Sequence, residues 1–303
     1  MVTGSAPPRA SRRRTNFFGR AGGGVFVTAL TLLFAVAAYL VATGAFLAHV
    51  IFGKSALRRW AHAGLATGAA LHLIALGSRV AVFGYQALAP LPEQLSLIAL
   101  LAVSVYLGVA LRAPLTAAGA VLAPLAFLAS LSAYYFEQGP MPGPTGSGGF
   151  WLAIHVGHTL LGYAVFALSF CLSLAYLFQE HQLKSKARTG VFRRLPPLET
   201  LDQWNHRFVA WGFVFFTIGI LSGSWLAQRA WGALWSWDPV QTWSGIAWLL
   251  YAGLLHARSV GWRGKRAAQL IVLSFLLLLA SFIGVNTLLP GRHGIQTSWS
   301  HSS

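Results

Sequence analysis

Apolar residues along this chain fall in long runs, and the polar residues gather in short connections between them. A run of about 20 apolar residues has the length of an α-helix that crosses a bilayer. The pattern predicts about eight such helices. They lie near residues 25–51, 60–83, 95–112, 114–134, 150–178, 208–227, 243–258 and 267–288. We therefore expect an all-α fold, a polytopic bundle of about eight transmembrane spans.

The chain shows no internal sequence repeat, and its connections are too short to form a second domain. The stretch EQGPMPGPTGSGG at 137–149 is rich in Gly and Pro, which is typical of a loop. We expect one polytopic unit in three parts: a basic N-terminal tail at 1–24, N-terminal transmembrane helices at 25–136, and a transmembrane core at 150–303. This core contains a tryptophan-rich segment at 225–243.

Composition supports a membrane protein. Of the 303 residues, 56% are hydrophobic and only 9% are charged, and the mean hydropathy is +0.61. The formal charge of +16 comes from Lys and Arg in short clusters between the apolar runs. That distribution is typical of loops beside membrane lipid. We expect an integral membrane protein with no nucleic-acid partner.

The single cysteine, Cys171, lies inside an apolar run. One cysteine excludes a disulfide framework, a zinc finger and a Cys-x-x-Cys-His site for covalent haem. The chain is therefore neither a thiol oxidoreductase nor itself a c-type cytochrome.

The cations also predict an orientation, because Lys and Arg favour the inner side of a membrane. With the N-terminus outside, fourteen cations fall on inner connections and three on the outer side, apart from the N-terminal tail. The inner set is Lys54, Arg58, Arg59, Arg112, Lys184, Lys186, Arg188, Arg193, Arg194, Arg207, Arg258, Arg263, Lys265 and Arg266, and the outer set is Arg79, Arg229 and Arg292. The five Arg residues of the tail favour the opposite orientation, and an extra or missing helix near the start would reconcile the two. We expect the tryptophan-rich segment on the outer face.

The stretch WGALWSWDPVQTW at 231–243 gathers four tryptophans and one of the chain's six carboxylates. Tryptophan is common wherever a helix meets lipid headgroups, and such a belt explains two or three indoles at a helix end. Six lie along this one connection: Trp225, Trp231, Trp235, Trp237, Trp243 and Trp248. The spacing predicts an aromatic face over about two helical turns, lying in the membrane interface. A flat apolar macrocycle would stack on such a face.

The residues Asp238-Pro239-Val240-Gln241 have the pattern of a helix start. Asp238 is the expected N-cap, Pro239 the first helical residue, and Gln241 the second member of a capping box. Capping gives the Asp238 carboxylate a structural role, which is compatible with positioning a ligand.

The segment and its surroundings resemble a known family. WGALWSWDPVQTW, followed by LLHAR and then GVNTLLPGRHG, is similar to the tryptophan-rich haem-handling proteins of cytochrome c biogenesis. The resemblance is greatest to the CcsA/ResC-type subunit of the system II cytochrome c synthetase, and it covers roughly residues 150–295. The family usually has Glu where this chain has Gln241, so the capping box is kept while a negative charge is lost.

Two histidines flank the tryptophan-rich segment in sequence and share its side of the membrane. His155 in WLAIHVGHTLLGY lies near the outer end of a predicted span, and His293 in LLPGRHG follows the last span. Two axial imidazoles are a common way to hold haem iron. His158 lies on nearly the same helix face as His155, and spacing does not choose between them. The resemblance favours His155 and His293 as ligands of an outer haem.

His256 in LLHAR lies thirteen residues beyond Trp243, about 20 Å deeper at 1.5 Å per residue. Arg258 is expected to reach the inner headgroups and leave His256 within the span. The resemblance makes His256 a ligand of a haem inside the membrane, with the partner ligand from a companion CcsB/ResB-type subunit. His72, near the middle of the second predicted span, is an internal candidate for that partner ligand.

The resemblance implies cytochrome c biogenesis, with haem b as the substrate and apocytochrome c as the partner that receives it. Haem would cross the membrane and be presented by Trp231, Trp235, Trp237, Asp238 and Trp243 for covalent thioether attachment. No residue has the pattern of a general base, so no catalytic residue is assigned. One alternative is a haem exporter or haem-delivery accessory protein without attachment activity; another is an electron-transfer cytochrome b. The expected location is a bacterial inner (cytoplasmic) membrane or a thylakoid membrane.

Overall fold

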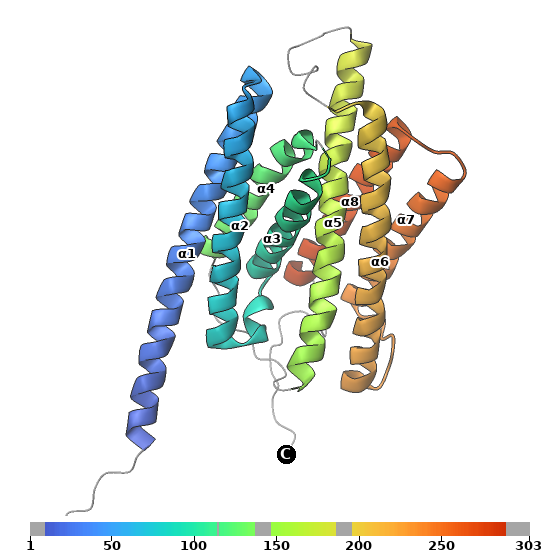
Figure 1. Cartoon of the computed structure of the whole chain (residues 1–303). Helices are drawn as coiled ribbons and strands as arrows, with labels where there is room; N and C mark the ends of the chain where they lie inside the picture. The colour runs from blue at the N-terminus through green and yellow to red at the C-terminus, as the bar shows by residue number, and fades with distance from the viewer. Residues whose placement is uncertain (1–9, 114, 137–146, 186–195, 289–303) are drawn as a thin grey trace, which may run out of the picture.

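Eight α-helices and one short 3-10 helix make up the described part of the chain (Figure 1). The structure is a computed structural model that describes residues 10–113, 115–136, 147–185 and 196–288, and these contain no strand. The elements are α1 (Ala10–Phe52), α2 (Ser55–Phe83), η1 (Tyr85–Leu88), α3 (Leu91–Ala110), α4 (Thr116–Tyr135), α5 (Ser147–Lys184), α6 (Leu198–Trp231), α7 (Pro239–Ser259) and α8 (Lys265–Leu288). The predicted all-α bundle is confirmed.

Each predicted span corresponds to one helix, and most helices are longer than the apolar run that predicted them. Helix α1 begins at Ala10, so the second half of the predicted basic tail is helical. Among the described residues, seven helices are long and apolar enough to cross a membrane, and α7 is the one that is not. Gln241, Thr242 and Ser244 make the first turns of α7 polar. Helix α7 nevertheless packs against α6 and α8 within the bundle (Figure 1).

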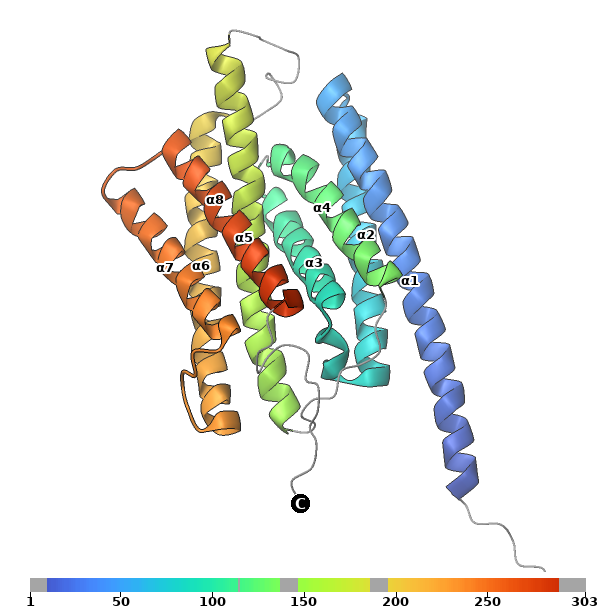
Figure 2. The ribbon, with the colours of Figure 1, turned by 180° about the vertical axis from the view of Figure 1, so that it is seen from behind.

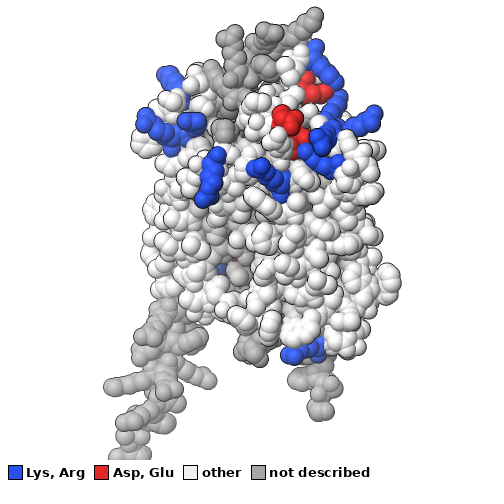
Figure 3. All heavy atoms as spheres, turned by 45° about the vertical axis from the view of Figure 1, so that its right-hand side comes forward, with Lys and Arg blue, Asp and Glu red and all other residues white. Residues whose placement is uncertain are grey.

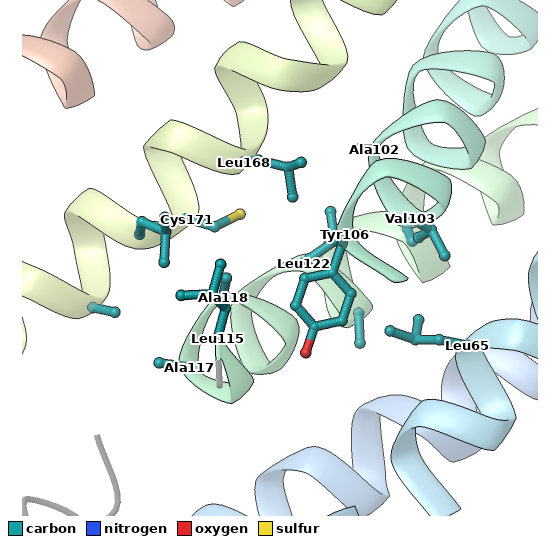
Figure 4. Close-up of a cluster of buried hydrophobic side chains, with 14 of the residues drawn as sticks. Leu65, Ala102, Val103, Tyr106, Leu115, Ala117, Ala118, Leu122, Leu168 and Cys171 are labelled. Atoms are coloured by element: carbon teal, nitrogen blue, oxygen red, sulfur yellow. The ribbon is translucent and has the colours of Figure 1, made fainter. Parts of the chain in front are cut away.

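Helix α5 lies at the centre of the bundle and is the most buried of the candidate spans. One of its faces, with Leu168 and Cys171, packs into a cluster with α1, α2, α3 and α4 (Figure 4). Its other face, with Tyr163 and Phe166, packs into a cluster with α6, α7 and α8. Seen from behind, α8 crosses beside α5, while α1 and α2 lie at the far edge (Figure 2). The two halves of the molecule therefore meet on α5.

Glycines bring α5 and α6 close together. A Cβ atom added at Gly162 would lie 3.0 Å from the backbone nitrogen of Phe216, and one at Gly219 would lie 3.0 Å from the Cα of Thr159. At Gly212 the added atom would lie 2.6 Å from the Phe166 ring. Small residues at helix contacts are typical of membrane proteins, because packing takes the place of the hydrophobic drive.

Polar side chains join the antiparallel helices α2 and α3 at three levels. Arg79 pairs with Glu93 at 2.8 Å, with side-chain exposures of 6% and 3%. The His72 ring is hydrogen-bonded to Ser96 at 2.5 Å, and His62 to Tyr106 at 3.2 Å. Polar groups inside a membrane protein are costly unless they are paired, so these contacts fix which faces of α2 and α3 meet.

Most Lys and Arg residues of the connections gather at one end of the bundle. On the face shown in Figure 3 the cations drawn in blue cluster there, with the acidic side chains among them. Helix α1 begins at the opposite end (Figure 1), so the arginines at its start do not follow this sorting. The connections α1–α2, α3–α4, α5–α6 and α7–α8 share the cationic end, and the α6–α7 connection lies at the other (Figure 1). The predicted sorting of the connections into two groups therefore matches the fold.

Replacing Glu93 by Gln should strongly destabilise the N-terminal half. The change removes the carboxylate charge that faces the buried Arg79 guanidinium. Breaking a buried ion pair by removing one partner costs about 3–5 kcal/mol in the free energy of unfolding. Thermal unfolding of the detergent-purified chain measures the loss. Glu199→Gln, at the exposed start of α6, is the control, and the double replacement Arg79→Met with Glu93→Leu should restore most of the stability. Equal melting temperatures for Glu93→Gln and Glu199→Gln would contradict the importance of the pair.

Candidate functional site

The tryptophan-rich connection between α6 and α7 is irregular rather than helical. Helix α6 ends at Trp231, Gly232 takes a left-handed conformation with φ 73°, and α7 begins at Pro239. Residues 232–238 between them have no helical turn. The prediction of an aromatic face over two helical turns is therefore wrong. A glycine after the last helical residue and a proline at the start of the next helix are strong boundary signals.

Asp238 is the N-cap of α7, as predicted. Its Oδ1 accepts a hydrogen bond of 3.0 Å from the backbone N–H of Val240, and the side chain is buried. Gln241 differs from the predicted capping box, because its Oε1 accepts from the backbone N–H of Ser236 at 2.8 Å and from the Ser236 hydroxyl at 3.0 Å. It thus ties the connection two residues ahead of the cap. Both bonds end on an oxygen acceptor, so a Glu at this position would accept them equally well.

Two indoles of the connection are held in different ways. Trp235 packs over Gly245 of α7, where an added Cβ would lie 3.1 Å from the ring. Its ring meets that of Trp237 edge to face, with centroids 6.1 Å apart. Trp237 is 78% exposed and has a φ of 54°, a left-handed conformation that is unfavourable for a bulky residue. Strain of this kind is concentrated at functional sites. Trp243, in the second turn of α7, is also exposed, whereas the side chain of Trp231 lies outside the described part.

A second aromatic pair lies between the ends of α5 and α6. The rings of Trp151 and Trp225 have centroids 5.0 Å apart, and the Arg229 guanidinium lies 4.1 Å over the Trp225 ring. Sequence reasoning did not single out Trp151, although it lies one helical turn before His155. The aromatic surface at this end of the bundle therefore includes α5.

His155 is held against α6 by a hydrogen bond and by a glycine. Its Nδ1–H donates to the Gly219 carbonyl at 2.8 Å, and a Cβ at Gly223 would lie 2.5 Å from its Cε1 atom. Because a carbonyl only accepts, the ring proton is on Nδ1 and the lone pair is on Nε2. Metal-binding histidines are commonly oriented by such a bond through the other nitrogen.

His158 has the same protonation but a different surrounding. Its Nδ1–H donates to the Ile154 carbonyl of its own helix at 2.8 Å. Both imidazoles therefore carry the lone pair on Nε2, and hydrogen bonding does not choose between them. His155 differs in that it contacts Gly219 and Gly223 of α6, close to Trp225. The predicted second outer ligand, His293, lies outside the described residues.

His256 lies on an exposed part of α7, one turn before the helix ends. Arg258 does not extend to the headgroups as predicted, because its guanidinium forms two hydrogen bonds to Asp202 of α6, at 2.8 and 2.7 Å. Asp202 was not singled out from the sequence, although it is one of only six acidic residues.

His72 is fully buried. Its Nε2 is hydrogen-bonded to Ser96 at 2.5 Å and its Nδ1 to the Tyr39 hydroxyl at 3.4 Å. Helix α2 packs mainly on α1 and α3, and α7 packs on α6 and α8. The structure therefore does not bring His72 and His256 together.

Comparison with known proteins now defines the class. The family described as "Cytochrome C assembly protein" matches residues 88–293. The chain is a polytopic helical membrane protein that belongs to the cytochrome c assembly family.

Within that family it is of the CcsA type. The "Cytochrome c biogenesis protein CcsA" of Guillardia theta is 34% identical over 244 residues, covering 73% of this chain and 80% of the relative. That of Trieres chinensis is 32% identical over 250 residues, covering 72% of this chain and 80% of the relative. That of Parasynechococcus marenigrum is 38% identical over 165 residues, 47% of this chain and 54% of the relative. The chain thus acts in cytochrome c biogenesis.

A solved structure shares the fold. "Cytochrome c Heme Lyase CcmF" superposes with a TM-score of 0.64 over 86% of this chain, at 19% sequence identity. The chain spans 49% of that protein, so the likeness shows a common helical architecture.

Gly223→Ala should displace His155. The added methyl group would overlap the imidazole, because a Cβ there lies 2.5 Å from Cε1. We expect cytochrome c maturation in cells expressing the variant to fall by about tenfold, as when a group that orients a metal ligand is lost. Gly77→Ala, where no atom lies within 4 Å of the added methyl group, should mature cytochrome c normally. Normal maturation by Gly223→Ala would show that the position of the His155 ring against α6 is not needed for cytochrome c maturation.

Asp238→Asn should keep the stability of the wild-type chain, because Asn caps a helix as well as Asp does. Asp238→Ala removes the acceptor for the Val240 N–H and should cost about 1 kcal/mol. Thermal unfolding of the two variants in detergent makes the comparison. A loss in the Asn variant as large as that in the Ala variant would mean that the carboxylate charge, rather than the cap, holds the connection.

Proposed function

We propose that this chain carries haem b across the membrane and presents it at the tryptophan-rich end for covalent thioether attachment to apocytochrome c. Membership of the cytochrome c assembly family gives the biological process. The observation that carries the finer proposal is the His155 imidazole, which is fixed against α6 with its lone pair on Nε2 beside the Trp151–Trp225 pair.

The direction of transport follows from the charges. Cations favour the inner side of a membrane, and they gather at the end opposite the tryptophan-rich connection. The tryptophan-rich end then faces outward, to the periplasm of a bacterial inner membrane or to the lumen of a thylakoid. Haem enters from the cationic side and leaves at the aromatic side.

His155 and His293 are the proposed axial ligands of the outer haem, with His158 as the competitor for His155. Trp231, Trp235, Trp237 and Trp243 supply the aromatic surface, and Asp238 fixes the connection to α7. Trp237 and Trp243 are exposed, so their rings are accessible to a flat apolar substrate. The porphyrin supplies the four equatorial ligands of a haem iron, so the protein needs to supply only the axial ones. Two histidines are enough for this site.

His256 is the proposed ligand of a haem inside the membrane. An imidazole on an exposed helix face is costly if lipid surrounds it, so its exposure favours a cover from another molecule. A companion CcsB/ResB-type subunit supplies that cover and the second ligand. His72 is less suited to this role, because both of its ring nitrogens are hydrogen-bonded within the N-terminal helices.

The proposed contribution to the reaction is positioning. Each thioether bond forms when a cysteine S–H adds across a vinyl group of haem, so no leaving group is released. Holding haem and thiol in one geometry lowers the entropic part of the barrier, and the reactivity belongs to the haem. The proposal assigns no residue as a general base.

Delivery of haem without attachment is the second candidate. It is favoured by the described connections at the aromatic end, since 84–90 and 232–238 are too small to hold an apocytochrome. Binding of apocytochrome c to the chain together with its companion subunit distinguishes the two: attachment requires that binding, and delivery to another carrier does not.

Spectra of histidine variants test the proposal. Reduced-minus-oxidised absorption with haem quantitation is recorded for the purified complex and for His155→Ala, His158→Ala, His293→Ala and His256→Ala, with the exposed loop-side His181→Ala as control. We expect the two outer variants and His256→Ala each to lose or shift a haem signal, and His158→Ala and His181→Ala to retain it. A complex without haem, or maturation at the wild-type rate in His155→Ala and His293→Ala, would refute the proposal.

A further inference from the structure

The carboxylate of Asp202 joins three parts of the molecule at the cationic end. Its two oxygens accept hydrogen bonds of 2.8 and 2.7 Å from the Arg258 guanidinium at the end of α7. Oδ1 also accepts a bond of 3.0 Å from the backbone N–H of Gly264, which directly precedes α8. The second turn of α6, which carries Asp202, is therefore joined by this one side chain to the last turn of α7 and to the α7–α8 connection.

This ion pair is shielded from solvent. The side chains of Arg258 and Asp202 are 16% and 9% exposed, and His206, Leu254 and Trp262 line a cavity of about 10 Å³ beside Arg258. That volume is about the minimum that holds one water molecule. A two-point Arg–carboxylate contact in such surroundings is geometrically specific, so it sets the rotation of the end of α7 about its own axis.

The rotation of α7 decides where His256 points. Residues two apart on an α-helix lie about 200° apart around its axis, so they face nearly opposite sides. With Arg258 directed inward to Asp202, His256 is directed outward, and it is indeed exposed. Residues 261 and 264 then reverse the chain with φ values of 96° and 68°, and the Gly264 bond to Asp202 fixes the end of that turn.

We propose that Asp202 is a positioning residue for His256, acting through Arg258. The pair holds the imidazole on the outer face of α7 and thereby sets the occupancy of the haem site in the membrane. This inference rests on the proposed function for its consequence on haem, whereas the orientation of His256 is a property of the chain alone. The two parts therefore have separate tests.

Cysteine labelling tests the orientation without haem. The chain has one cysteine, Cys171, which is fully buried, so a Cys171→Ala background has no thiol. His256→Cys in this background is labelled with a maleimide in detergent, with and without Asp202→Asn. We expect Asp202→Asn to slow the labelling of position 256 and to leave unchanged that of Leu249→Cys, on an exposed part of α7 remote from the pair. Equal rates at position 256 with and without Asp202→Asn would overturn the inference.

Haem occupancy tests the consequence. The haem that is absent from His256→Ala defines the occupancy of the membrane site. In the complex with the companion subunit, Asp202→Asn and Arg258→Lys should each lower this occupancy by about tenfold, as replacements of groups that orient a ligand do. Arg258→Lys keeps the charge and loses the two-point contact. The control Glu180→Gln removes the ion pairs of Glu180 with Lys184 and Lys265 at the same end and should retain haem.

The outcomes separate the two proposals. Slower labelling with no haem change in His256→Ala itself would refute the proposed membrane haem site and leave the positioning role in place. Loss of haem in His256→Ala, together with full haem in Asp202→Asn, would refute the positioning role and leave the haem site in place.

Discussion

The close contact of α5 with α6 is the constraint on which the rest of the structure depends. In a membrane two helices gain little from apolar burial, and their association relies on packing and on hydrogen bonds. Gly162 on α5 and Gly212, Gly219 and Gly223 on α6 allow the backbones to approach. Both hydrophobic clusters use α5, so its position relative to α6 also determines how the two halves meet. The same contact seats His155, because its neighbours are Gly219 and Gly223.

Two shielded guanidinium groups of the described chain each lie against a carboxylate. Arg79 pairs with Glu93, and Arg258 pairs with Asp202. His72 is satisfied by Ser96 and Tyr39. His256 differs, since it lies on an exposed face in a helix that packs across the bundle. A residue that is costly in lipid is retained where it has a use, and this contrast is what directs the proposal to His256 rather than to His72.

The sequence predicts the helices well because bilayer thickness imposes a length on each apolar run. It also predicts the Asp238 cap, which depends on four adjacent residues. The predicted helical aromatic face is wrong, because Gly232 and Pro239 are stronger signals for a helix break than the indole spacing is for a helix. Other contacts were beyond the reach of periodicity. Asp202 and Arg258 are 56 residues apart, and no local pattern pairs them, so the expectation that Arg258 extends to the headgroups overlooked the one carboxylate that the fold places beside it.

The two ends of α7 are fixed by hydrogen bonds to different kinds of donor. At the aromatic end, Asp238 and Gln241 use backbone and hydroxyl donors of the helix start and of Ser236. At the cationic end, Asp202 uses a guanidinium and a backbone N–H. A helix fixed at both ends cannot rotate as a whole, so Trp243 near its start and His256 near its end keep a constant relation. Under the proposed function, Trp243 and His256 would contact haem at two different depths on one helix that is fixed at both ends.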